Sequence, residues 1–174
     1  MIFVTVGTQL PFDRLVRAVD EWAGSRGRRD VIAQVGPGSY AAKNIEARPF
    51  MSPQECAEHM RKADAIVAHA GMGSIIGALE LGKPILIMPR RAALGEHRND
   101  HQLATVRRFA EREGVLVAMN EDELPDRLDA LQAVGGAGKL SPYATAPLLE
   151  AVRAFIENRP LPSAAGRTLE EAPA

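Results

Sequence analysis

The segment DAIVAHAGMGSIIGALELGKPILIMPRR, residues 64–91, decides the fold of this chain. It begins with a buried apolar run over 64–69, turns at glycines over 70–73, and continues as a short helix over 74–81 that ends at Gly82. A second apolar run completes the segment. A strand, a helix and a strand in this order predict a βαβ unit with parallel strands.

Two glycines, Gly71 and Gly73, stand between the first strand and the helix of this unit. Without a side chain they allow a sharp turn and a close approach of a ligand to the backbone. The amides of Met72, Gly73 and Ser74 would then point together at the positive end of the helix, with the Ser74 hydroxyl as a further donor. This arrangement suits a phosphate or diphosphate. The alternative is that the glycines serve only a tight turn and close packing of the helix on the strand.

The composition describes an ordinary α/β protein. The chain has 174 residues, enough for one well-packed domain. Its residues are 46% hydrophobic but only 5% aromatic, which suits short buried strands alternating with Ala-rich helices. With 21 Lys and Arg against 22 Asp and Glu, the net charge is -1. We therefore expect no nucleic-acid partner, and any anion site must be local.

The sequence carries no sign of export. Cys56 is the single cysteine, so no internal disulfide can form, which fits a reducing compartment. The first residues resemble a strand rather than a secretion signal, and no run of about 20 apolar residues could span a bilayer. We expect a cytoplasmic protein, attached to a membrane only through another molecule.

Apolar segments of strand and helix type alternate along the rest of the chain. Further strands are expected over 2–6, 31–35, 44–50 and 115–119, and further helices over 12–23, 53–62, 99–113, from 120–125 onward and over 148–156. Ser52 and Glu55 form a capping box before the helix that starts at Pro53. The alternation predicts a single Rossmann-like α/β domain over 1–158 with an open, mostly parallel sheet, followed by a flexible tail over 159–174.

Ligands of such sheets bind at the carboxyl ends of the strands. Here that edge should collect Gly7 and Thr8, Phe50 and Met51, and the segments 69–74 and 89–102. A nicotinamide cofactor is one reading, because Arg90 and Arg91 could imitate a clamp for its 2′-phosphate. However, the glycine spacing is G-x-G-x-x-x-G rather than G-x-G-x-x-G.

The sequence gives little indication of a metal site. No D-x-D motif occurs, so the divalent-metal clip of many sugar-nucleotide enzymes is missing. His97 and His101 lie four residues apart, but a third zinc ligand cannot be placed, and two solvated loop histidines are the alternative. We expect no metal and no cofactor.

The run HAGMGSIIGALELGKPILIMP (69–89), followed by EHRNDHQLA (96–104), resembles the donor-binding domain of glycosyltransferase family 28. VTVGT (4–8) and FMSP (50–53) also fit, so the resemblance covers about 1–155. The chain is most similar to a small, single-domain branch in which the donor half is a separate polypeptide. That branch includes the catalytic subunit of the dolichol-linked N-acetylglucosaminyltransferase and bacterial exopolysaccharide glycosyltransferase subunits. The resemblance implies a fold equivalent to the C-terminal half of a GT-B glycosyltransferase.

The resemblance also implies a UDP-sugar donor and assigns roles to residues. The uracil would lie at the Phe50–Met51 backbone, the diphosphate at 71–74 facing Gly7, the ribose at Glu80 and the sugar at 100–102. The implied donor-binding residues are Gly7, Thr8, Phe50, Met51, Gly71, Met72, Gly73, Ser74, Glu80, Asp100, His101 and Gln102. The candidate catalytic residues are His69, His97 and Gln102, and Arg90, Arg91 or Arg98 would assist the leaving group.

Several of these residues have simpler explanations. Glu80 near a helix C-terminus meets an unfavourable dipole, which favours a binding role, but it could be an ordinary solvated glutamate. Asp100 and Gln102 could serve as helix cap and surface residues, and His69 could merely fill the end of a strand.

The mechanism implied by the family is inverting, metal-independent displacement at the anomeric carbon. Two-domain relatives take their general base from an acceptor domain, and this chain has none. We therefore expect a UDP-sugar-dependent hexosyltransferase subunit for polysaccharide biosynthesis, active on a lipid-linked acceptor only with a membrane-anchored, acceptor-binding partner at the inner face of the membrane. The helix over 148–156 would dock this partner or pack on its own sheet. The alternatives are a stand-alone nucleotide-sugar-binding protein and a transferase acting on a small soluble acceptor.

Overall fold

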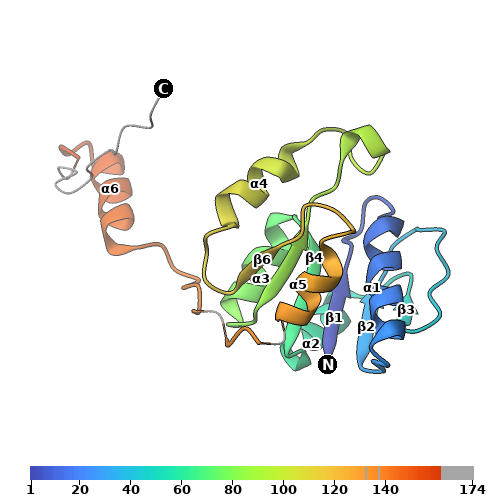
Figure 1. Ribbon diagram of the computed structural model, residues 1–174. Helices are drawn as coiled ribbons and strands as arrows, with labels where there is room; N and C mark the ends of the chain where they lie inside the picture. Colours follow the sequence, from blue (N-terminus) through green and yellow to red (C-terminus); the bar gives the residue numbers. More distant parts are fainter. Residues whose placement is uncertain (132, 137, 162–174) are drawn as a thin grey trace. The chain divides into compact units, whose positions relative to one another are not determined.

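The computed structural model describes residues 1–131, 133–136 and 138–161. Within them, six strands form one open sheet in the order β3-β2-β1-β4-β5-β6, and every neighbouring pair is parallel. The strands are β1 (Ile2–Thr5), β2 (Val31–Gln34), β3 (Glu46–Arg48), β4 (Ala65–His69), β5 (Ile85–Met88) and β6 (Val115–Val117). This order places β1 and β4 at the centre and confirms the predicted Rossmann-like α/β fold (Figure 1).

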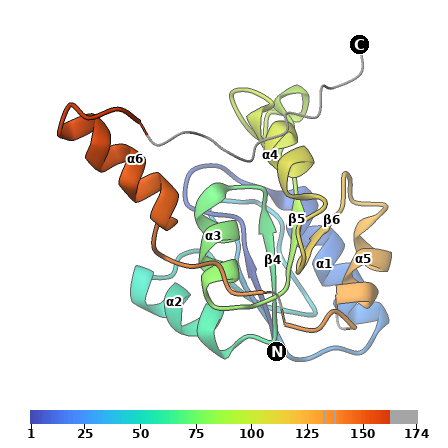
Figure 2. The ribbon, with the colours of Figure 1, turned by 90° about the vertical axis from the view of Figure 1, so that its left-hand side faces the viewer.

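Helices cover both faces of the sheet (Figure 2). They are α1 (Asp13–Ser25), α2 (Pro53–Lys62), α3 (Met72–Glu80), α4 (His101–Phe109) and α5 (Leu124–Leu131), with a 3-10 turn η1 (Ala92–Leu94) before α4. Side chains alternate along each strand, so Val4 and Val67 pack with α1 and α5 on one face. Phe3 and Ile66 pack with α2, α3 and α4 on the other. The sheet is therefore buried on both sides, as its continuous apolar strands require.

The start of α2 confirms the predicted capping box. The Ser52 side chain accepts a hydrogen bond from the Glu55 amide at 3.3 Å, and the Glu55 carboxylate accepts one from the Ser52 amide at 2.7 Å. Pro53 occupies the first helical position, so the local sequence fixes this boundary.

Two helices begin elsewhere than predicted. Helix α3 begins at Met72 rather than Ser74, because the N-cap Gly71 has extended angles (φ -92°, ψ 135°) and the helix starts directly after it. Helix α4 begins at His101 and ends at Phe109, which is shorter than the predicted 99–113. Asn99 still contributes, since its side-chain oxygen accepts a hydrogen bond from the His101 amide at 3.3 Å.

Strand β3 is also shorter than the predicted 44–50. The Asp20 carboxylate, buried on α1, accepts hydrogen bonds from the amides of Lys43, Asn44 and Ile45 at 2.7–3.1 Å. These amides are therefore not available to a neighbouring strand, and pairing begins only at Glu46.

The chain divides into two compact units, 1–140 and 141–174. The second contains α6 (Ala146–Ile156), which confirms the predicted last helix. Its apolar residues Leu148, Leu149, Val152, Phe155 and Ile156 are all exposed. Residues 162–174 of the predicted tail lie outside the described residues. Among the helices that are described, none combines the length and apolar character needed to cross a bilayer.

Candidate functional site

A polar cavity of about 300 Å³ lies where β1 and β4 end. Its walls come from the loop after β1, the turn before α3 and the segment leading into α4, and they include Gly7, Thr8, His69, Gly71, Arg90, His97, His101 and Gln102. The structure thus brings together predicted site residues that lie up to about 95 positions apart, as the carboxyl edge of a parallel sheet requires.

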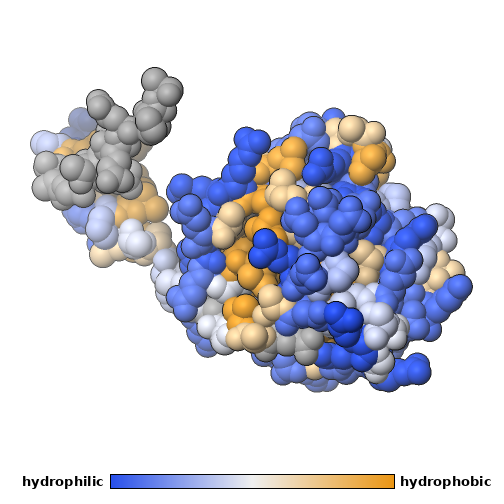
Figure 3. All heavy atoms as spheres, in the orientation of Figure 1, coloured by the Kyte–Doolittle hydropathy of each residue, from blue (hydrophilic) through white to orange (hydrophobic). Residues whose placement is uncertain are grey.

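Two other hollows are lined by almost none of the predicted site residues. A larger one of about 690 Å³ lies between α1 and the start of α5, lined by charges of both signs. A third, of about 520 Å³, is lined by Met72, Ile76, Phe109 and Leu140, with Arg108 and Arg112 at its margin. Apolar side chains gather on the surface beside α4 in Figure 3.

The start of α3 adjoins the polar cavity at Gly71. The amide of Ile75 makes the first helical hydrogen bond, to the Gly71 carbonyl at 3.2 Å. The preceding amides of Met72, Gly73 and Ser74 therefore have no acceptor within the helix, and no side chain caps them. A Cβ built on Gly73 would meet nothing within 4 Å, so the space beside Gly73 at this helix end is open. An anion could reach these amides without displacing protein atoms.

The ring of His69 explains two of the glycines. Gly7 has φ +77°, and a Cβ there would lie 2.9 Å from Cε1 of His69. A Cβ on Gly71 would overlap Nε2 of the same ring. A sharp turn and the close approach of a ligand are the two predicted reasons for glycine at position 71. Its backbone angles are ordinary, and the structure adds a third reason, the close approach of the His69 ring.

His69 is neutral in the folded protein. Burial, followed by the positive charge of Arg90, lowers the pKa of His69 from 6.5 to about 4. The Thr5 backbone acts in the opposite direction and raises this pKa, but its contact with the ring does not have hydrogen-bond geometry, so the buried Nδ1 has no such partner among the described residues. A neutral imidazole offers one N–H and one lone pair, so His69 can donate to an anion without itself carrying charge.

Two further histidines line the cavity: His97 from the segment before α4, and His101 from the first position of that helix. The His97 and His101 rings meet edge to face, with centroids 4.5 Å apart, and Nδ1 of His101 contacts Oδ1 of Asn99. Burial and then His101 lower the pKa of His97, whose Nδ1 is buried and lacks a partner in the described structure. In residues 1–131, 133–136 and 138–161, no three His, Cys, Asp or Glu side chains are grouped to hold a metal.

Asp100 and Gln102 take part in local structure. Oδ1 of Asp100 accepts a hydrogen bond from the Ala92 amide at 2.8 Å, which fixes η1, and Asp100 is the N-cap of α4 without a side-chain capping bond. Gln102 is 3% exposed, and its Oε1 accepts a hydrogen bond from the Arg90 amide at 3.0 Å. Each side chain keeps polar atoms beyond these bonds, so both roles can coexist with ligand binding.

A further hollow of about 310 Å³, here called the Phe50 hollow, adjoins the polar cavity at Thr8, which borders both. Phe50 lines this hollow and is 71% exposed, an unusual state for a phenylalanine. The Met51 side chain is buried in the core, so only its backbone is available to a ligand.

Glu80 lines neither the polar cavity nor the Phe50 hollow. It is the exposed last residue of α3, about 12 Å along the helix from its start. A ribose contact by Glu80 stays a prediction without support from this geometry.

Sequence reasoning missed a buried polar network beneath the site. Gln34 Nε2 donates to the carbonyl of Gly7 at 3.0 Å and of Pro49 at 3.5 Å, while its Oε1 accepts from the Thr5 hydroxyl at 2.8 Å. Thr5 Oγ1 in turn accepts from the Gly7 amide at 3.2 Å. The sequence offered one signal for this network: Gln34 ends an apolar strand, and a side-chain amide buried there must find hydrogen-bond partners.

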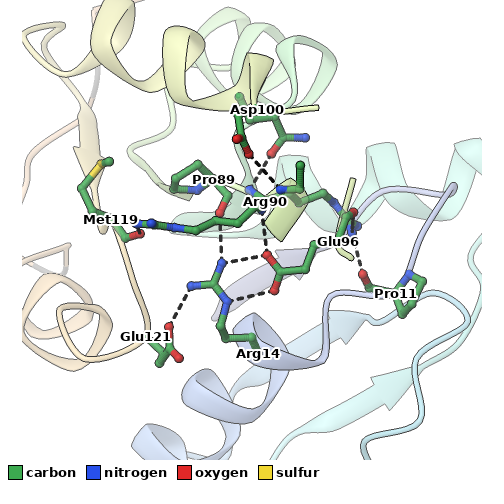
Figure 4. A network of polar contacts seen from close by, with 11 residues as sticks. Pro11, Arg14, Pro89, Arg90, Glu96, Asp100, Met119 and Glu121 are labelled. Carbon is green, nitrogen blue, oxygen red and sulfur yellow. Dashed lines mark hydrogen bonds and ion pairs between the residues drawn. The ribbon is translucent and has the colours of Figure 1, made fainter. Parts of the chain in front are cut away.

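A second network links the loops at the far side of the cavity (Figure 4). Arg14 binds Glu96 through two hydrogen bonds of 2.9 and 2.8 Å, and also binds Glu121 at 2.7 Å. The Glu96 carboxylate accepts a further bond from the Arg91 amide at 2.9 Å. Arg14 also donates to the Pro89 carbonyl at 3.2 Å, so these contacts hold the residues on both sides of η1 against the start of α1.

Comparison with known proteins gives consistent results. The model of the glycosyltransferase family 28 C-terminal domain matches residues 1–145. A human protein named UDP-N-acetylglucosamine transferase subunit ALG13 is 30% identical over 112 residues, which are 59% of this chain and 9% of that protein. The mouse protein of the same name is 31% identical over 105 residues, 55% of this chain and 9% of its own length. The chain thus spans about a tenth of the length of these relatives.

Solved structures share the fold at lower identity. The NMR structure of ALG13 is 22% identical, with a TM-score of 0.56 over 87% of this chain and 93% of the other. The crystal structure described as the glycotransferase of kitacinnamycin is 21% identical, with a TM-score of 0.56 over 76% of this chain and 34% of the other. Both likenesses concern the fold of the backbone.

Proposed function

The chain belongs to the glycosyltransferase family 28 C-terminal domain family, and from this premise we propose that it is the donor-binding subunit of a glycosyltransferase that uses a UDP-sugar. The printed names of the human and mouse relatives, UDP-N-acetylglucosamine transferase subunit, support this donor class and make UDP-N-acetylglucosamine the first donor to test.

One observation carries the proposal: the uncapped amides of Met72, Gly73 and Ser74 open beside a polar cavity at the carboxyl edge of the sheet. Preorganised amides at a helix start stabilise the negative charge that builds on a departing diphosphate. His69 adds a neutral N–H from the same edge. The leaving group would thus be stabilised by groups of this chain alone.

The two hollows that meet at Thr8 suit the two ends of a nucleoside diphosphate. The diphosphate would lie between Gly7 and the start of α3. The base would lie against the exposed Phe50 ring, since aromatic side chains stack well on nucleobases. The transferred sugar would then face Asp100, His101 and Gln102, with His97 as the nearby candidate for a general base.

We further propose that the acceptor is lipid-linked and is bound by a separate, membrane-anchored subunit. The word subunit in the names of the relatives supports a partner. On this proposal the chain is cytoplasmic, works at the inner face of the membrane, and docks its partner through the exposed apolar residues of α6.

Calorimetry tests the donor. The purified chain should bind UDP-N-acetylglucosamine, UDP-glucuronic acid or UDP-glucose, and thymidine diphosphate sugars should bind more weakly. Chain that binds no uridine diphosphate sugar would overturn the proposal.

A transfer assay tests the partner requirement. Turnover on a lipid-linked acceptor should appear only when the co-encoded acceptor-binding protein is added. Full turnover by the chain alone would disprove the need for a partner. Donor binding without transfer under any condition would favour a stand-alone binding protein.

A further inference from the structure

Arg90 follows β5 at the carboxyl edge of the sheet and is only 3% exposed. Its guanidinium donates four hydrogen bonds, all to backbone carbonyl oxygens. The acceptors are Val6 at 2.7 Å, Leu10 at 2.7 Å, Pro11 at 2.5 Å and Glu96 at 3.1 Å. Four backbone bonds from one buried side chain form an unusually complete clamp, because arginine has five donors in a rigid fork.

These bonds join the walls of the polar cavity. Val6, Leu10 and Pro11 belong to the loop after β1, which carries Gly7 and Thr8, and Glu96 belongs to the segment before α4. The Arg90 amide also donates to Gln102 at the start of α4. Figure 4 shows Arg90 with two of its partners, Pro11 and Glu96, beside the Arg14–Glu96 pair. Arg90 therefore fixes both sides of the cavity relative to the sheet.

The charge of Arg90 is not cancelled by a bonded carboxylate. Its four acceptors are neutral, and in the described part of the chain it forms no ion pair within 4 Å. The nearby Glu96 carboxylate is shared between Arg14 and the Arg91 amide. The centroid of the buried Phe12 ring lies 4.7 Å from Cζ of Arg90, so the ring excludes water from that side of the guanidinium.

The pKa values of two partly buried histidines of the cavity, His69 and His97, respond to this charge. After burial, Arg90 is the next largest cause that lowers the pKa of His69, and it acts on His97 in the same direction, after His101. The other charged groups that act on them are His97 for His69, and Arg98 for His97. The described lining of the cavity includes Arg90 and no carboxylate, although the chain as a whole is close to neutral.

We propose that Arg90 is a positioning residue for the diphosphate: it holds the loop after β1 and the segment before α4 around the ligand and supplies positive charge from behind them. This inference rests on the proposed donor site. It gives the cavity a preference for the more highly charged of two otherwise similar nucleotides.

The test compares UDP with UMP by calorimetry on three variants. Arg90→Met removes the clamp and the charge, and should lower UDP affinity about tenfold more than UMP affinity. Arg90→Lys keeps the charge but not the fork, so both ligands should weaken while the ratio of their affinities stays near that of the wild type. Arg107→Met, which removes one exposed cation from α4, is the matched control and should change neither affinity.

The wild-type chain provides a second measurement, needed if Arg90→Met does not fold. NMR titration of the wild type should find the His69 and His97 pKa values raised when inorganic pyrophosphate is added, because the anion offsets Arg90. A folded Arg90→Met variant with an unchanged UDP to UMP ratio, or pyrophosphate that leaves both titrations unmoved while it binds, would overturn the inference alone. Wild-type chain that binds neither UDP nor pyrophosphate would overturn the proposed function and this inference with it.

Discussion

Replacing Gly73 by alanine should make the protein more stable and its donor site weaker. Gly73 is the second residue of α3, so its backbone is already helical, and the added Cβ meets nothing within 4 Å. Alanine in place of a helical glycine stabilises by up to about 1 kcal/mol, because the unfolded chain loses freedom. For a unit of this size that corresponds to a rise in Tm of about 2–4 °C.

The same methyl group would occupy the open space beside Gly73, at the helix end where we place the diphosphate. Crowding a closely packed contact by one methyl costs about 1–3 kcal/mol, which weakens UDP binding about fivefold to 150-fold. The assay pairs thermal unfolding without ligand with calorimetry using UDP.

Gly77→Ala is the matched control for this variant. Gly77 lies in the same helix, and its added Cβ would lie 3.1 Å from Cε of Met60, a flexible side-chain end that can move. The control should bind UDP like the wild type. A Gly73→Ala variant that gains stability and still binds UDP with wild-type affinity would refute the placement of the diphosphate.

Three further changes test the site and its support. The pKa of His69 is about 4 in the folded chain and near 6.5 in the unfolded chain, so between these pH values the unfolded chain binds one more proton. The free energy of unfolding therefore has a contribution of at most about 3 kcal/mol that is present above pH 6.5 and is lost as the pH falls toward 4. His69→Gln should flatten this loss in urea unfolding curves measured from pH 4 to 7. Asp20→Asn should lower the free energy of unfolding by about 2–3 kcal/mol, because it weakens charge-assisted hydrogen bonds from the amides of residues 43–45. The control Glu21→Gln, on the exposed side of α1, should change the free energy of unfolding little. Equal effects of the two substitutions would contradict the role of Asp20. Phe50→Ala should leave the Tm unchanged and weaken UDP about tenfold without affecting pyrophosphate, and a loss of both ligands would disprove base stacking.

The sequence by itself determined the fold class and the family. Alternating apolar runs predicted the parallel sheet, and the Ser52–Glu55 box located the start of α2 correctly. The pattern around Gly71 and Gly73 indicated glycosyltransferase family 28, whose model matches residues 1–145. These features are local: a cap, a period or a motif acts over a few residues, so a short window of sequence contains the physical cause.

The tertiary structure alone decided which polar groups meet. Gly71 is required by the ring of His69, and the Gly7 loop is held by Gln34 and by Arg90, whose acceptors lie up to 84 positions away. Glu80 shares the helix of the binding motif yet lies at its other end, away from the cavity. A buried donor or acceptor pairs with whatever the order of strands brings within about 3 Å, and no local pattern encodes that distance.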